Sequence, residues 1–129
     1  MTIGTELRDD ARPSEPETLQ FKGAGVTLVA SAWGDQDDPP IVFLHGGGQT
    51  RHAWGGTAAA VAKEGWYALT VDLRGHGESD WAPGGDYDML SFGQDVSAVA
   101  RSFNQPPVLV GASLGGMATM LAVGEADRQ

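Results

Sequence analysis

Cysteine is absent from the 129-residue sequence, which excludes disulfide bonds, cysteine-based zinc sites and thiol nucleophiles. Basic side chains are also scarce: 8 Lys and Arg stand against 17 Asp and Glu, a formal net charge of −9. Proteins that bind DNA or RNA need clustered positive charge to meet the phosphate backbone. We therefore expect no nucleic-acid partner.

Long hydrophobic runs are missing as well. The apolar runs are only a few residues long, too short to cross a bilayer, so no membrane partner is expected. Charges are spread through the first 20 residues and leave no apolar stretch for a secretory signal peptide. Because 41% of the residues are apolar, the composition is typical of a globular domain. These features predict a soluble cytoplasmic protein with one folded domain.

The chain divides into a polar arm and a folded part. Residues 1–17 hold too little apolar surface to offset the cost of ordering, so we expect a flexible acidic arm. Residues 18–129 form the folded part. At its start, Thr18–Lys22 and Val26–Trp33 partly alternate between apolar and polar residues around two glycines, which predicts an antiparallel hairpin.

Beyond the hairpin, short apolar runs alternate with segments of helical length. The runs, typical of strands buried on both faces, are Ile41–Leu44, Ala68–Val71 and Val108–Val110. Helical spacing of apolar residues predicts helices over residues 50–63, 88–103 and 113–124. This alternation predicts an α/β fold with a predominantly parallel sheet and flanking helices.

Two details of these helices are also predicted. Asp86 or Asp88 is placed to cap the second helix through its side chain. In the third helix the side chains expected to point inward are Leu114, Met117, Ala118 and Leu121.

The strongest motif is Gly-Ala-Ser-Leu-Gly at residues 111–115, which follows an apolar strand and leads into a helix. Gly-x-Ser-x-Gly in this context is typical of a nucleophile elbow, a strained turn that lifts a serine hydroxyl above the sheet. Glycines on both sides remove Cβ atoms that would collide there. The helix N-terminus and the backbone N–H of Leu114 favour negative charge beside Ser113. The alternative is an ordinary N-cap serine in a glycine-rich turn.

Two further motifs follow apolar strands. The sequence His-Gly-Gly-Gly at residues 45–48 forms a loop whose free N–H groups can supply a second oxyanion donor, which we expect to be Gly47. The sequence Asp-Leu-Arg-Gly-His-Gly-Glu-Ser occupies residues 72–79, after the next strand. Within and near it, Asp72, Arg74 and Asp95 are expected to form loop hydrogen bonds or solvated pairs.

In their order and spacing these three motifs resemble the α/β-hydrolase family over about residues 18–124. Residues 45–54 are similar to bacterial esterases and cofactor-free haloperoxidases. The resemblance implies that Ser113 is the nucleophile, that Gly47 and Leu114 form the oxyanion hole, and that no cofactor is used. It implies a hydrolase acting on an ester or related acyl bond of a small substrate. Esterase, thioesterase, carbon–carbon hydrolase and perhydrolase chemistry stay open. A serine at this position disfavours the branch that uses an aspartyl ester.

The rest of a catalytic triad is not found after Ser113. The family orders its triad as serine, acid and histidine, and the acids after Ser113 are Glu125 and Asp127, with no histidine. The histidines lie upstream, at His45, His52 and His76, where we expect them to shape or line loops. Their spacing predicts no metal site. We therefore interpret residues 18–129 as the N-terminal part of an α/β-hydrolase domain, truncated after the helix that follows Ser113.

The remaining candidates concern substrate and partners. Close to the predicted site, and able to line it, are Gly46, Gly48, Trp54 and Trp81. An unpaired strand at residues 107–112 would be a template for association. We expect a homo-oligomer or a complementary C-terminal chain as partner. The alternative function is a catalytically silent half-domain that associates through this open sheet edge.

Overall fold

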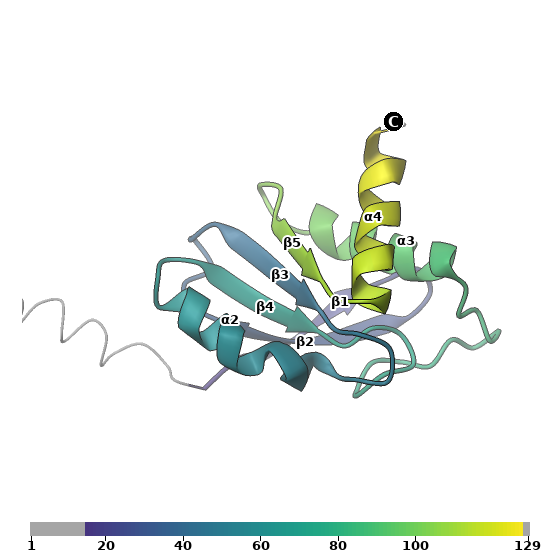
Figure 1. The fold of residues 1–129 in the computed structure, drawn as a ribbon, viewed down its shortest axis with the longest axis horizontal. Coiled ribbons are helices and arrows are strands. Elements are labelled where there is room, and N and C mark those ends of the chain that lie inside the picture. Colours follow the sequence, from purple (N-terminus) through teal and green to yellow (C-terminus); the bar gives the residue numbers. More distant parts are fainter. Residues whose placement is uncertain (1–14, 128–129) are drawn as a thin grey trace, which may run out of the picture.

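The computed structural model describes residues 15–127, with side chains to Gly124. The predicted arm at residues 1–17 therefore lies almost wholly outside the described residues, and its last residue, Glu17, begins the first strand. In chain order the elements are β1 (Glu17–Lys22), β2 (Thr27–Trp33), β3 (Pro40–Leu44), η1 (Arg51–Trp54), α2 (Gly55–Ala62), β4 (Tyr67–Val71), α3 (Met89–Arg101), β5 (Val108–Gly111) and α4 (Leu114–Asp127) (Figure 1). None of the described helices has the length and apolar character needed to cross a membrane.

The strands form one sheet in the order β1-β2-β4-β3-β5. β1 and β2 pair antiparallel with Glu17 opposite Ala32, which confirms the predicted hairpin. β3 pairs parallel with both β4 and β5, as the apolar runs predict. Because β2 pairs antiparallel with β4, the sheet described here is mixed, with a parallel half that carries the motif loops.

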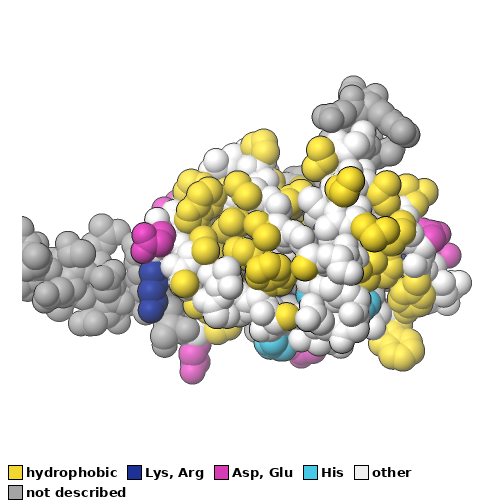
Figure 2. All heavy atoms as spheres, in the orientation of Figure 1, with side chains coloured by type: hydrophobic (Ala, Val, Ile, Leu, Met, Phe, Trp, Pro, Cys, Tyr) yellow, Lys and Arg dark blue, Asp and Glu magenta, His cyan; other side chains and the backbone are white. Residues whose placement is uncertain are grey.

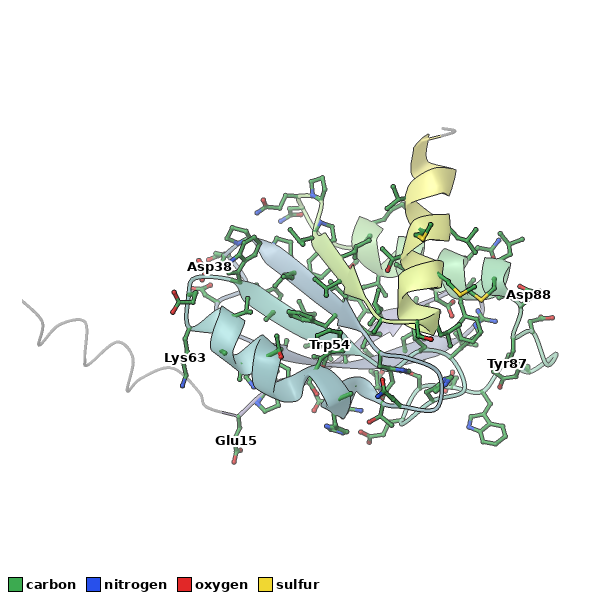
Figure 3. All side chains as sticks on the ribbon, in the orientation of Figure 1. Glu15, Asp38, Trp54, Lys63, Tyr87 and Asp88 are labelled. Atoms are coloured by element: carbon green, nitrogen blue, oxygen red, sulfur yellow. The ribbon has the colours of Figure 1, made fainter. Side chains whose placement is uncertain are left out.

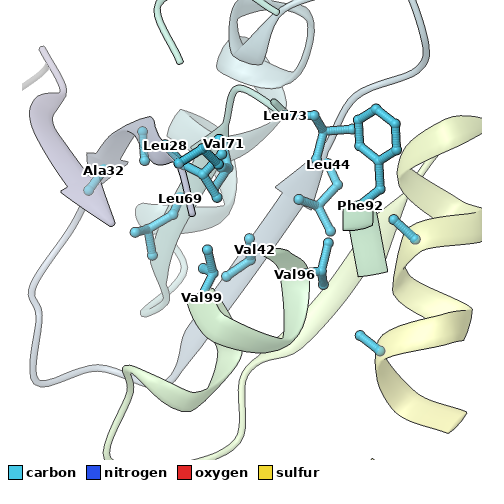
Figure 4. Packing of buried hydrophobic residues seen from close by; sticks show 14 residues of the cluster. Leu28, Ala32, Val42, Leu44, Leu69, Val71, Leu73, Phe92, Val96 and Val99 are labelled. Atoms are coloured by element: carbon cyan, nitrogen blue, oxygen red, sulfur yellow. The ribbon is translucent and has the colours of Figure 1, made fainter. Parts of the chain in front are cut away.

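Helices cover both faces of the sheet (Figure 1). Successive residues of β3 point to opposite faces, so Val42 and Leu44 join one buried cluster while Ile41 and Phe43 join the other. The first cluster packs strand residues against α3 and α4 (Figure 4). The second packs strand residues against α2. Each fully buried aliphatic side chain stabilises the fold by about 1.5–3 kcal/mol, so β3, buried along its whole length, anchors both layers.

The first two predicted helices are present with revised ends. The helix expected over residues 50–63 starts as the 3₁₀ turn η1 and continues as α2. The tighter first turn accompanies a hydrogen bond from the Arg51 backbone N–H to the Asp72 carboxylate, 2.6 Å long. At α3 the cap is Asp88, whose carboxylate accepts from the Ser91 N–H at 2.7 Å. That hydrogen bond lowers the pKa of Asp88.

α4 packs differently from the prediction at two positions. Ala118 is buried and Leu114 is partly buried, as expected, but Met117 is 53% exposed and Leu121 is 42% exposed. α3 approaches α4 so closely that a Cβ atom on Gly93 would lie 2.9 Å from the Cβ of Leu121. The glycine therefore lets α3 approach α4 at Leu121, and the ends of the Met117 and Leu121 side chains stay accessible to solvent.

Candidate active site

Ser113 lies in a tight turn between β5 and α4, which is the strand–turn–helix order that the sequence predicts. Its φ is 54°, and among the described residues it is the one non-glycine residue with a positive φ. A left-handed backbone costs an L-residue about 1–2 kcal/mol. The side chain is exposed, so this strained turn presents the Ser113 hydroxyl to solvent.

Neighbouring backbone leaves no room for side chains at the two motif glycines. A Cβ atom on Gly111 would lie 2.5 Å from the carbonyl oxygen of Gly115, and one on Gly115 would lie 2.7 Å from that of His45. Both distances are shorter than real Cβ contacts allow. The glycines therefore permit the close approach of β5, α4 and the loop after β3.

That loop lies directly against Ser113. The Leu44 carbonyl accepts from the Ala112 N–H at 3.1 Å. A Cβ atom on Gly46 would lie 3.6 Å from the Cβ of Ser113, and one on Gly47 would lie 3.8 Å from Cδ2 of Leu114. The structure thus brings together the serine and the glycine loop, which are far apart in the sequence.

The backbone amides of Gly47 and Leu114 are available at this place. Neither donates a hydrogen bond to another residue within 15–127. Gly47 is exposed, and Leu114 is the first residue of α4, where the helix leaves N–H groups unpaired. Two free donors therefore accompany the exposed hydroxyl.

Gln49 holds the glycine loop in a tight turn, a role that the sequence motifs did not reveal. Its Oε1 accepts from the Gly46 N–H at 3.0 Å, and its own N–H donates to the Gly46 carbonyl at 3.1 Å. The turn also needs a left-handed residue, which is Gly48 with φ 79°.

Two histidines whose rings lie against each other at a tilt of 50° connect this loop to the loop after β4. His45 is fully buried; its Nδ1 donates to the Gly46 carbonyl at 2.7 Å and its Nε2 accepts from the Leu73 N–H at 3.0 Å. Burial lowers the pKa of His45.

The ring centroid of His76 lies 4.9 Å from that of His45. Its Nε2 accepts from the Gly48 N–H at 3.2 Å, and its Nδ1 lies 2.9 Å from the Arg74 carbonyl. The remaining histidine, His52, is exposed.

Beneath the loops, Arg51 forms a buried ion pair. Its Nη1 donates to the Asp72 carboxylate at 2.6 Å, its Nη2 donates to the largely exposed Glu78 at 2.6 Å, and its Nε donates to the Ser31 hydroxyl at 2.8 Å. Burial opposes the charge of Arg51, but the hydrogen bonds that it donates to Glu78 and Asp72 outweigh burial and raise the pKa of the guanidinium. The network ties the start of η1 to the loop after β4.

A second buried pair joins that same loop to α3. Arg74 donates through Nε and Nη2 to the Asp95 carboxylate at 2.6 and 2.8 Å, and this pairing raises the pKa of Arg74. Arg74 also donates to the carbonyls of Ala24 and Asp86. The expected loop hydrogen bonds are confirmed, since Asp72 accepts from the N–H groups of Arg51 and Glu78 and Asp95 accepts from that of Ala24. The other alternative, solvated pairs, is wrong, because the side chains of Asp72, Arg74 and Asp95 are buried.

The two candidate tryptophans lie in different settings. Trp54 is half-buried beside α2, where its ring lies 5.2 Å from that of Phe43 and its Nε1 donates to the Leu44 carbonyl at 3.2 Å (Figure 3). Trp81 is 77% exposed. Within residues 15–127 no cluster of His, Asp or Glu side chains is arranged to hold a metal ion.

The chain is similar in sequence and fold to known proteins. A family model described as the alpha/beta hydrolase fold matches residues 39–128. The chain is 33% identical to Esterase Rv0045c of Mycobacterium tuberculosis, over 79% of this chain and 33% of that protein. It is 31% identical to a non-heme chloroperoxidase of Streptomyces lividans, over 71% of this chain and 33% of that protein. The solved thioesterase domain from the curacin biosynthetic pathway is 28% identical, with a TM-score of 0.75 over 88% of this chain and 40% of that domain. The chain thus spans about a third of the length of the curated relatives it matches.

Proposed function

Because the chain belongs to the alpha/beta hydrolase fold family, we propose that it takes part in acyl transfer to water with Ser113 as the nucleophile. The observation that carries the proposal is the exposed Ser113 hydroxyl on a left-handed backbone, next to the amides of Gly47 and Leu114, which have no acceptor among the described residues. In this proposal the turn at Ser113 is a nucleophile elbow, and the two amides form the oxyanion hole.

In the proposed reaction, Ser113 Oγ attacks the acyl carbon of an ester or related substrate, and a histidine takes the hydroxyl proton. Negative charge that develops on the carbonyl oxygen is held by the Gly47 and Leu114 N–H groups; one such donor is worth about 10²–10³ in rate. The leaving group takes the proton from the histidine, and water then hydrolyses the acyl-serine.

The histidine of this reaction is not among the histidines of the chain. His45 and His76 are each committed through both ring nitrogens to backbone groups, and His52 is exposed on η1. The family orders its triad as serine, acid and histidine, and no histidine follows Ser113 in this sequence. We propose that a segment outside these 129 residues supplies both the acid and the histidine.

Fluorophosphonate labelling tests this proposal, because the probe reacts with an activated serine. Two preparations are compared, the 129-residue chain and the product of the whole gene. We expect label on Ser113 in the preparation that supplies the histidine, none after Ser113→Ala, and undiminished label after Ser97→Ala, a serine on α3. Label on another residue would refute Ser113 as the nucleophile.

A second candidate, a silent half-domain that binds a partner, is favoured by the exposed apolar side chains around β5 and α4. β5 pairs only with β3 among the described strands. Val108 is 45% exposed, and along α4 the exposed residues include Met117, Met120 at 75%, and Val123. Figure 2 shows hydrophobic side chains over this face of the molecule. The occupant proposed is a second copy or a complementary C-terminal chain.

Sedimentation and turnover separate the two candidates. The silent module predicts a concentration-dependent dimer that Met120→Glu weakens, and no hydrolysis of a short nitrophenyl ester by the 129-residue chain. Hydrolysis by that chain, abolished by Ser113→Ala, would rule the silent module out. A cytoplasmic location is part of either proposal, and fractionation of cells that express the gene tests it.

A further inference from the structure

We propose that His76 is a positioning residue, which holds the 45–48 loop in the shape required by the acyl transfer proposed above, on which this inference rests. His76 does not touch the reacting atoms. It acts through the backbone N–H of Gly48, which donates to its Nε2 at 3.2 Å.

The hydrogen bonds of the ring define its protonation state. Nδ1 of His76 lies 2.9 Å from the Arg74 carbonyl, and because a carbonyl oxygen only accepts, the proton resides on Nδ1. Nε2 is then the acceptor that the Gly48 N–H needs. Both ring nitrogens are used, and the ring must be neutral for both bonds to exist together.

The conformation of the loop at Gly47 depends on the two peptide planes on either side of it, and the Gly47 N–H lies in the first of them. The first plane is held through the Gly46 carbonyl, which accepts from His45 Nδ1 and from the Gln49 N–H. The second plane is held through the Gly48 N–H by His76. With both planes fixed, Gly47 keeps one conformation.

Packing does not provide this support on the Gly48 side. Gly48 is exposed, has φ 79°, and would have nothing within 4 Å of an added Cβ atom. A glycine in such open space samples many backbone conformations. The hydrogen bond to His76 is therefore the contact that fixes the second plane.

Protonation of His76 would remove the acceptor, since an imidazolium has N–H groups at both ring positions. Among titratable and charged residues, His45 lies against the ring and the Arg74 carbonyl meets Nδ1. From the packed elements, Asp72 and Glu78 lie in the loop after β4, Tyr87 packs on Phe92, which itself contacts the ring, and Asp95 of α3 pairs with Arg74. The buried carboxylates are already paired, Asp72 with Arg51 and Asp95 with Arg74. Acid should therefore loosen the loop through His76.

Two variants and a control test the proposal. His76→Gln keeps an acceptor oxygen near the place of Nε2 but does not titrate, whereas His76→Ala removes the acceptor. His52→Gln, on an exposed histidine, is the matched control. The first readout is the NMR shift of the Gly48 amide of the 129-residue chain against pH. The second readout is the rate of fluorophosphonate labelling of Ser113 in the product of the whole gene. Each variant's rate is divided by the wild-type rate at the same pH, because titration of the catalytic base affects both rates and then cancels.

We expect the Gly48 amide to titrate together with the His76 ring in the wild type and the His52 variant, and to lose that titration in His76→Gln. The rate of Ser113 labelling should fall about tenfold in His76→Ala. This is less than the loss of about 10²–10³ expected when an oxyanion donor is removed, because the Gly47 N–H is still present but less well positioned. The His76→Gln ratio should rise as the pH falls. A Gly48 amide that ignores the His76 titration, or wild-type labelling in His76→Ala, would overturn the proposal. If no preparation labels Ser113, the proposed function fails, and the Gly48 titration still decides whether His76 holds the loop.

Discussion

Gly115 donates its backbone N–H to the carbonyl oxygen of His45 at 3.1 Å. This bond joins the first turn of α4, which directly follows Ser113, to the loop after β3, which carries Gly47. The space between them is filled, because a Cβ atom on Gly115 would lie 2.7 Å from the same oxygen.

Gly115→Ala should therefore destabilise the protein by about 1–3 kcal/mol, the usual cost of overpacking. The matched control is Gly124→Ala, on the same helix, where an added Cβ atom meets nothing within 4 Å. Alanine is the better helix former by about 1 kcal/mol, so this control should be stabilising. Urea denaturation followed by circular dichroism measures both changes, and equal stability of the two variants would contradict the close approach at Gly115.

Asp72→Asn should destabilise the protein by about 3–5 kcal/mol, because it leaves the buried Arg51 guanidinium without its buried counter-charge. Glu78→Gln is the control, because Glu78 pairs with Nη2 of the same Arg51 guanidinium. The Glu78 side chain is 68% exposed, so its pair should be worth under about 1 kcal/mol. Urea midpoints give both values; similar losses in the two variants would mean that burial does not govern this network.

Thr70→Val should stabilise the protein by about 1 kcal/mol. The Thr70 hydroxyl is buried on β4 with no hydrogen-bond partner in the described part of the chain, and a buried unpaired polar group costs about 1–3 kcal/mol. Thr57→Val, at an exposed position of α2, should change stability by about 0.5 kcal/mol or less. Thermal denaturation compares them, and a lower melting temperature for Thr70→Val would show that the hydroxyl has a partner in solution.

Stability should fall as the pH is lowered from neutrality, and His45 should be one cause. Burial holds the folded-state pKa of His45 below its unfolded value of about 6.5, so the unfolded chain takes up a proton that the folded chain resists. The contribution of His45 is complete above the unfolded pKa and is lost below it, by at most about 1.4 kcal/mol per pH unit.

Urea midpoints between about pH 7 and pH 5.5 measure this slope, above the range where most carboxylates titrate. His45→Gln should flatten the slope, whatever its effect on stability at pH 7. The exposed His52→Gln should leave the slope as in the wild type. An unchanged slope in His45→Gln would assign the pH dependence to other groups.

Local patterns predicted most of the fold. Apolar runs located β3, β4 and β5, and alternation around glycines located the β1–β2 hairpin. The meeting of the glycine loop with Ser113 could also be expected, because the carboxyl ends of parallel strands reach the same edge of a sheet. The family resemblance is confirmed by the match over residues 39–128.

Contacts between distant segments were beyond the sequence patterns. The exposure of Met117 and Leu121 depends on how closely Gly93 lets α3 approach α4. The hydrogen bond between Gly48 and His76 joins positions 28 residues apart, and neither residue carries a local pattern that signals the other. Such side-chain partners follow from tertiary packing, not from periodicity.

The positive φ of Ser113 has an evolutionary consequence. Left-handed backbone is tolerated best by glycine, and next by short polar residues such as asparagine and aspartate. A turn of this shape therefore admits several small polar side chains without being rebuilt. A single codon change at position 113 could replace the reactive group while leaving the scaffold intact, so new chemistry would be within reach of point mutation.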